Sequence, residues 1–94
     1  MPWIIQYSKQ AERQLKKLDA SVQDRIRSFM EDRVALRDEP ESLAKKLSGA
    51  YESLIRYRVG DYRVVCEIHQ HVLVVTVIAV AHRREVYRRI SGRS

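Results

Sequence analysis

The sequence has few of the residues on which several classes of protein depend. One cysteine, Cys66, stands among 94 residues, so no internal disulfide can form and nothing indicates an oxidising compartment. Three glycines leave no glycine-rich loop for the phosphates of a nucleotide. The longest apolar run, Val72–Ala81, is too short for a membrane-spanning helix, which needs about 20 residues. The first residues lack the basic and apolar regions of a secretory signal, so we expect a cytoplasmic protein.

The charge of the chain is positive and unevenly distributed. Eighteen Lys and Arg residues against twelve Asp and Glu residues give a net charge of +6. All the Lys and Arg residues after position 50 are arginines, and all the lysines lie before position 50. Because the guanidinium group is a planar fork that matches phosphate and carboxylate, the second half indicates recognition of such groups. A basic surface that only keeps the protein soluble fits the composition equally well.

Hydrophobic patterning predicts one globular α+β domain over residues 1–94. A strand at 3–7 precedes two amphipathic helices, for which Ser8 and Asp19 are the N-cap candidates, and Pro40 requires the second helix to end before it. The connector at 41–50 leads into three further strands, at 53–59, 62–68 and 72–81.

The predicted order is therefore β-α-α-β-β-β. Gly60 and Asp61 form the signal for a tight hairpin turn, and the reversal at 69–71 has a weaker signal because it lacks glycine. The last strand is apolar on both faces and should be central. The two helices are expected to pack on one face of a small, mostly antiparallel sheet. A basic tail, 82–94, should begin as a turn or a short helix.

Strand alternation places a group of arginines on the sheet face that the helices leave open. Arg56, Arg58 and Arg63 share that face, and Arg83 and Arg84 join them if the last strand ends beside it. Such a face fits the phosphates of RNA. Ordinary surface salt bridges are the alternative, and the acidic partners would be Glu52, Glu67 and Glu85.

Other chemistry has weaker support in the sequence. His69 and His71 project to the same side of an extended chain and His82 is a third imidazole, but three histidines without a Cys or Asp cluster are a weak metal signal. We therefore predict no metal site. Cys66 lies on the predicted core face and is expected to be a small buried hydrophobic residue.

Two segments in this order make the chain resemble the RelE branch of the RelE/ParE toxin superfamily. They are 57–65, Tyr-Arg-Val-Gly-Asp-Tyr-Arg-Val-Val, and 82–87, His-Arg-Arg-Glu-Val-Tyr. The segments at 5–11 and 17–19 fit the same pattern, so the resemblance covers essentially the whole chain. It implies a toxin of a type II toxin–antitoxin pair. It also implies an endoribonuclease that cuts mRNA in the ribosomal A site without a metal or other cofactor, by attack of the ribose 2′-OH.

The resemblance also assigns roles to residues. Arg63 and Arg83 match the catalytic arginines, although Arg84 is an alternative to Arg83 because the preceding loop varies in length. Tyr87 matches a tyrosine that stacks on the substrate base or assists proton transfer. The resemblance also implies a set of substrate-binding residues, which are Arg56, Arg58, His82, Arg84 and Arg88.

Two positions depart from the family pattern. Leu54 stands where some members have a lysine, and Arg56 stands where the pattern often has another. Because arginine is too basic to accept a proton, the base would have to be Tyr87, His82, Glu85 or a group of the ribosome, and histidine is the most natural choice at neutral pH.

Two other functions remain open on the sequence. A ParE-like toxin has the same fold, inhibits DNA gyrase and has no nuclease activity; the two quoted segments favour the RelE branch. A non-catalytic RNA- or ribosome-binding module is the other alternative. The resemblance implies as partners a cognate antitoxin encoded alongside, the ribosome and mRNA, and no membrane.

Overall fold

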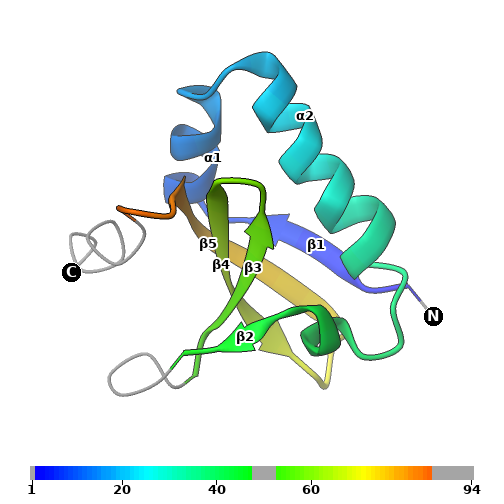
Figure 1. Ribbon diagram of the computed structural model, residues 1–94. Helices are drawn as coiled ribbons and strands as arrows, with labels where there is room; N and C mark the ends of the chain where they lie inside the picture. Colours follow the sequence, from blue (N-terminus) through cyan, green and yellow to red (C-terminus); the bar gives the residue numbers. More distant parts are fainter. Residues whose placement is uncertain (1, 48–52, 86–94) are drawn as a thin grey trace.

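The computed structural model describes residues 2–47 and 53–85, and shows an α+β fold in which two helices pack on one face of a five-stranded sheet (Figure 1). The helical part comprises α1 (Lys9–Lys16), α2 (Ala20–Ser28), a π-helical turn (Phe29–Val34) and a 3-10 turn (Pro40–Leu43). The strands are β1 (Ile4–Tyr7), β2 (Lys45–Lys46), β3 (Ile55–Val59), β4 (Tyr62–His69) and β5 (Val74–His82). The predicted fold class is confirmed.

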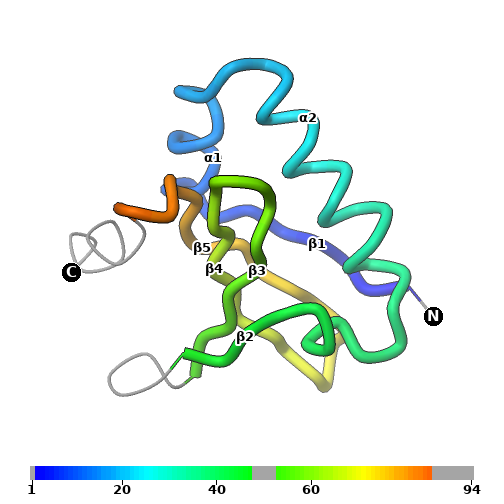
Figure 2. Tube along the Cα trace, in the orientation of Figure 1, coloured from blue at the N-terminus to red at the C-terminus, as the bar shows by residue number. Residues whose placement is uncertain are grey.

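The strand order of the sheet is β1-β5-β4-β3-β2. Only β1 pairs in parallel, with β5, and the other neighbours are antiparallel. The apolar strand β5 is an interior strand, paired on its two sides with β1 and β4, as its two apolar faces predicted. The connector at 41–50 was expected to have no strand, but Lys45 and Lys46 pair with β3 as a two-residue edge strand. Figure 2 traces this connector along the edge of the sheet.

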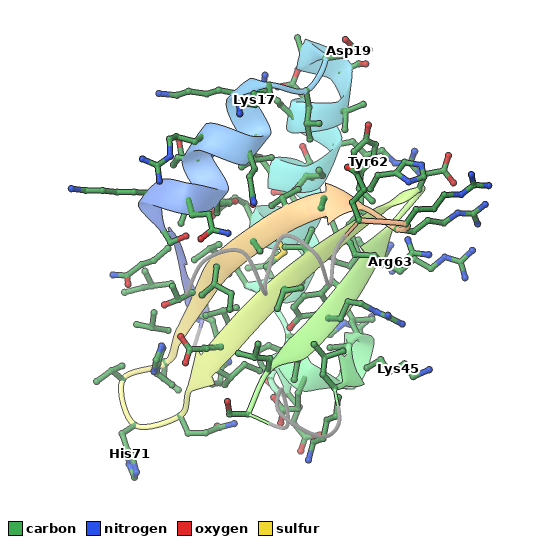
Figure 3. The ribbon with its side chains drawn as sticks, turned by 90° about the vertical axis from the view of Figure 1, so that its left-hand side faces the viewer. Lys17, Asp19, Lys45, Tyr62, Arg63 and His71 are labelled. Atoms are coloured by element: carbon green, nitrogen blue, oxygen red, sulfur yellow. The ribbon has the colours of Figure 1, made fainter. Side chains whose placement is uncertain are left out.

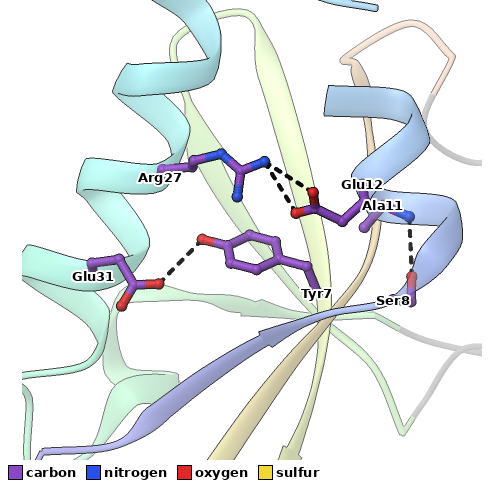
Figure 4. Close-up of polar contacts among 6 residues, drawn as sticks. All are labelled: Tyr7, Ser8, Ala11, Glu12, Arg27 and Glu31. Atoms are coloured by element: carbon purple, nitrogen blue, oxygen red, sulfur yellow. Dashed lines mark hydrogen bonds and ion pairs between the residues drawn. The ribbon is translucent and has the colours of Figure 1, made fainter. Parts of the chain in front are cut away.

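Both helix starts lie where the sequence predicted them. The Ser8 hydroxyl accepts a hydrogen bond from the Ala11 N–H at 3.0 Å, which satisfies one of the free amides at the start of α1 (Figure 4). Asp19 is the N-cap of α2, but its side chain makes no capping hydrogen bond. The second helix turns into the π-helical segment at Phe29 and so ends well before Pro40.

Polar contacts tie the two helices to β1. Arg27 of α2 forms an ion pair with Glu12 of α1 at 3.0 Å, and its guanidinium carbon lies 4.9 Å from the centre of the Tyr7 ring (Figure 4). The Tyr7 hydroxyl donates to Glu31 at 3.4 Å. Half-exposed pairs of this kind contribute little energy, so burial of the apolar helix faces holds the layers together.

The main core lies between the helices and the sheet. Its fully buried members include Leu15, Ile26, Met30, Tyr57 and Val64. Cys66 is 0% exposed within this core, as predicted. Burial raises the pKa of its thiol, so the side chain is inert as a nucleophile.

The open face of the sheet is less basic than predicted. A second buried apolar cluster occupies part of it and consists of Leu47, Leu54, Val65, Ile78, Ala79 and Ala81. A register shift opposite Val65 and Cys66 makes this possible, because Ile78 and Ala79 are consecutive yet both belong to the second cluster. The β-bulge thus changes which face the last residues of β5 occupy.

The two hairpin turns differ in how well their residues suit the left-handed backbone conformation, as the sequence indicated. Gly60 has a φ of 59°, the left-handed conformation that glycine adopts without steric cost. At the weaker reversal Leu73 takes a φ of 54°, which is unfavourable for a residue with a Cβ.

None of the helices within 2–47 and 53–85 is long and apolar enough to span a membrane.

Candidate functional site

The arginines that alternation assigned to the open face meet at one end of the sheet. Arg58 and Arg63 are register partners on β3 and β4, and Arg56 lies two residues earlier on β3. Arg83 follows the last residue of β5, and its backbone N–H donates to the carbonyl oxygen of Asp61 at 2.8 Å. This bond fixes the end of β5 beside the hairpin turn. In Figure 3 Arg63 lies at this end of the strands, and His71 lies at the other.

Two hydrogen bonds fix the side chain of Arg63. Its Nη1 donates to the carbonyl oxygens of Gly60 and Tyr62, both at 2.9 Å. These acceptors are neutral, so they orient the guanidinium group without cancelling its charge. A fixed cation of this kind is already oriented for a developing negative charge.

The other cations at this end act on Arg63. The pKa of Arg63 is lowered, first because its side chain loses part of its hydration, and then because positive charge surrounds it. The carboxylate of Asp61 opposes this effect only in part. The cations are Arg58, Arg56 and Arg83. Four arginines therefore share one electrostatic environment, in which an anion would relieve the mutual repulsion.

The salt-bridge alternative does not account for the two central arginines. Within 2–47 and 53–85, no carboxylate oxygen lies within 4.0 Å of a guanidinium nitrogen of Arg58 or Arg63. Glu52, one of the acidic partners considered for them, lies outside the described residues. The charge of this pair is thus available to a ligand.

His82 is positioned on the other side of the same strand end. Its ring packs edge-on against Tyr62, with 5.7 Å between the ring centres. Its Nδ1 accepts a hydrogen bond from the Arg84 N–H at 3.3 Å. An accepting Nδ1 places the proton of the neutral ring on Nε2. This arrangement occupies the lone pair that a general base needs, so it weakens the case for His82 as the base.

A small pocket beside His82 contains a lysine that the sequence interpretation missed. The pocket has a volume of about 150 Å³ and lies between the end of α1 and the end of β5. Lys17 lines it together with Tyr62, His82 and Glu85. The family pattern points to a lysine in the second half of the chain, which has none. No local signal distinguishes Lys17 from other exposed helix residues, and only the tertiary fold brings it to this strand end.

The remaining predicted site residues are distributed as follows. Arg84 is exposed and follows Arg83 in the turn after β5. Tyr87 and Arg88 lie outside the described residues, so their assignments stay predictions. His69 and His82 lie at opposite ends of β4 and β5, because His69 pairs with Val74 and His82 with Tyr62. The three histidines therefore cannot share one metal ion.

An α+β fold with arginines gathered at the end of a hairpin is the arrangement expected of the RelE/ParE toxin superfamily, which the sequence resembles. The model of the ParE toxin family of type II toxin–antitoxin systems matches residues 5–87. The chain therefore belongs to this family, within the RelE/ParE superfamily. The sequence matches no curated protein closely enough to add a relative.

Solved structures of RelE toxins and of RelBE toxin–antitoxin complexes share this fold. The chain is 24% identical to a chain of the RelBE2 toxin–antitoxin complex of Mycobacterium tuberculosis, with a TM-score of 0.81, and the match covers 88% of this chain and 93% of that one. An arginine double mutant of free E. coli RelE is 26% identical, with a TM-score of 0.70 and coverage of 99% and 98%. The archaeal RelE–RelB complex of Pyrococcus horikoshii gives 25% identity, a TM-score of 0.62 and coverage of 88% and 97%.

Proposed function

We propose that this toxin is a ribosome-dependent mRNA endonuclease. The observation that supports the proposal best is the environment of Arg63, a fixed guanidinium group among three further arginines. Similarity to RelE structures supports the same direction. A site built from arginines stabilises a phosphate that gains negative charge, and this is the demand of RNA cleavage.

In the proposed reaction the ribose 2′-oxygen attacks the adjacent phosphorus. The new 2′-O–P bond closes a 2′,3′-cyclic phosphate as the P–O5′ bond breaks, and the 5′-oxygen leaves as a hydroxyl after it takes up a proton. Arg63 and Arg83 would contact the non-bridging oxygens of the pentacoordinate phosphate. The proton of the 2′-OH would pass to Tyr87, to Glu85 or to a group of the ribosome, since the Nδ1 of His82 already accepts a hydrogen bond.

Primer extension on a translated message, after induction of the chain alone in bacterial cells, tests this proposal. We expect new 5′ ends inside codons that depend on ongoing translation. Arg13→Ala serves as a matched control, because Arg13 is an exposed arginine on α1, and it should cut as the wild type does. Intact message in cells that stop growing would contradict the proposal.

The family match favours a second candidate function. A ParE-like toxin would inhibit DNA gyrase without cutting RNA, and the family model that covers residues 5–87 is that of ParE toxins. DNA breaks that accumulate while the message stays intact would identify this activity. A non-catalytic RNA-binding module would produce neither cleavage nor DNA breaks.

We also propose that the chain is neutralised by an antitoxin encoded next to it. Several of the similar structures are toxin–antitoxin complexes, and a net charge of +6 favours an acidic or amphipathic partner. Such a partner would lay a helix or an extended segment over the basic surface. The chain expressed alone at high level should arrest growth, and normal growth would contradict this expectation.

A further inference from the structure

A second pocket, which is basic, lies on the far side of the hairpin turn from His82. Its volume is about 330 Å³, and it opens between α2, the following π-helical turn and the end of β3. Three arginines line it, Arg25, Arg33 and Arg58, against one acidic residue, Asp32. None of the predicted site residues except Arg58 belongs to this pocket.

The fold holds two of the three arginines of this pocket in place. The guanidinium group of Arg25 lies against the hairpin turn so closely that a Cβ on Gly60 would be 2.9 Å from its Nη1. The guanidinium carbon of Arg33 lies 5.3 Å from the centre of the Phe29 ring, within the range of a cation–π contact. The Phe29 ring is itself fixed edge-on against the buried Tyr57. These contacts reduce the entropy that the arginines would lose on binding a ligand.

The arginines of the pocket form no ion pair within the part of the chain that the structure describes, and Asp32 is the one acidic residue among the described lining residues. Over 2–47 and 53–85, no carboxylate oxygen lies within 4.0 Å of the guanidinium nitrogens of Arg25, Arg33 or Arg58. The guanidinium groups of Arg25 and Arg33 lie against the walls of this pocket, and Arg58 lines its edge. Guanidinium groups arranged around a concave surface fit an oxyanion with several acceptor oxygens. The pocket is therefore built for an anionic group.

Arg58 connects this pocket to the Arg63 group. It lines the pocket and is also the register partner of Arg63 on the open face. A ligand with regularly spaced anions along a chain can occupy both surfaces, as the backbone of RNA does. Continuity with the arginine face thus favours a nucleic acid over an isolated acidic side chain.

We propose that this pocket is a second phosphate-binding site for single-stranded RNA, so that one strand contacts Arg63 and then passes the hairpin turn to Arg25 and Arg33. The inference rests on the proposed function, because it extends the same RNA-binding surface. It adds a binding site that no step of the cleavage reaction requires.

The test measures binding of a 2′-O-methylated oligouridylate of about ten nucleotides, a length within the range that small single-strand-binding folds cover. This probe has no free 2′-OH, so it reports binding independently of cleavage. Fluorescence anisotropy over a series of salt concentrations gives the slope of log K against log salt. The magnitude of this slope is about 0.7 for each phosphate that the protein neutralises on a single strand.

Arg25→Gln and Arg33→Gln should each reduce the magnitude of the slope by about 0.7, whereas Arg13→Gln, which removes the same charge from an exposed helix surface, should leave it unchanged. Wild-type slopes in both pocket variants would overturn the proposal. A second result would also overturn the proposal: the variants lose binding to polyglutamate, but the slope for the oligouridylate stays the same. The pocket would then bind the carboxylates of a protein and not the phosphates of RNA.

The outcome is separable from that of the proposed function. If the wild-type chain cuts no message but the two variants reduce the slope, the phosphate site stands and the cleavage proposal fails. If the chain cuts message and the slopes are unchanged, the phosphate site fails alone. Melting temperatures near that of the wild type are expected for both variants, because Arg25 and Arg33 are exposed.

Discussion

Arg58 on β3 and Arg63 on β4 stand directly opposite each other in an antiparallel strand pair. Like charges in this position destabilise a sheet, because the two side chains leave the same face at close range. Within the described part of the chain no carboxylate oxygen lies within 4.0 Å of either guanidinium group. The Arg58–Arg63 pair therefore weakens the fold and concentrates positive charge, as expected for residues that bind an anionic ligand.

Arg58→Thr should therefore stabilise the protein. Threonine suits a strand, and removal of the like-charge pair should raise the free energy of unfolding by about 0.2–1 kcal/mol. Urea unfolding at low ionic strength measures the change, which should shrink as salt is added. Arg37→Thr, at an exposed position outside the sheet, is the control and should have little effect. A loss of stability in Arg58→Thr would show that the pair is compensated.

The chemical role of the arginines predicts a second result. Arg63→Ala and Arg83→Ala should each reduce the rate of mRNA cleavage by about 10²–10³, the typical effect of losing one preorganised charge in a reaction site. Both side chains lie outside the apolar clusters, so neither change opens a cavity. Primer extension at matched expression level measures the rate. Growth arrest equal to that of the wild type in both variants would remove these residues from the site.

Tyr87 gives a third prediction, which rests on the family resemblance and on its arginine neighbours in the sequence, Arg83, Arg84, Arg88 and Arg89. If its hydroxyl transfers a proton, Tyr87→Phe should lose most of the cleavage activity at an unchanged melting temperature. If the ring stacks on a base, Phe should be active and Tyr87→Ala inactive, since stacking contributes about 1–3 kcal/mol. An Ala variant whose melting temperature falls together with its activity would show a packing role instead.

Local patterns predicted most of the fold because they act over a few residues. Alternation along β3 and β4 put Tyr57, Val64 and Cys66 in the main core and Arg56, Arg58 and Arg63 on the opposite face. A Ser cap and a Gly-Asp turn were equally local signals, and both were confirmed.

Features that depend on distant parts of the chain were not predicted. The bulge at Ile78 and Ala79 interrupts alternation without any glycine to mark it, so the second apolar cluster on the open face was missed. The two-residue strand at Lys45 and Lys46 exists only because β3 lies beside it. Both pockets were missed for the same reason, since each joins a helix to a strand end far along the sequence.

The bulge region leads to a prediction about stability. The Oε1 of Gln14 accepts a hydrogen bond from the Val80 N–H at 2.7 Å, and so α1 satisfies a backbone donor of the interior strand β5. Gln14→Leu should leave that donor without a partner in a largely buried place and cost about 1–3 kcal/mol. Thermal unfolding measures the change. Lys17→Ala alters the same pocket at an exposed position and should leave stability nearly unchanged; equal losses in the two variants would contradict this account.

Three acidic groups, two in the core and one half-buried beside it, predict how stability depends on pH. Burial raises the pKa of the Cys66 thiol and of the Tyr7 and Tyr57 hydroxyls above their ordinary values, so each group stays protonated in the folded protein after it has ionised in the unfolded chain. The folded state then holds more protons, and stability falls as pH rises above the unfolded pKa of cysteine, about 8.5. Urea unfolding from about pH 7 to pH 10 should show this decline, at up to about 1.4 kcal/mol per pH unit for each group that differs fully in protonation. Cys66→Ala should start less stable, because it leaves a cavity, but its stability should decline less between about pH 8.5 and 10. A decline as steep as that of the wild type would show that the thiol ionises in the folded protein and is not held in the core.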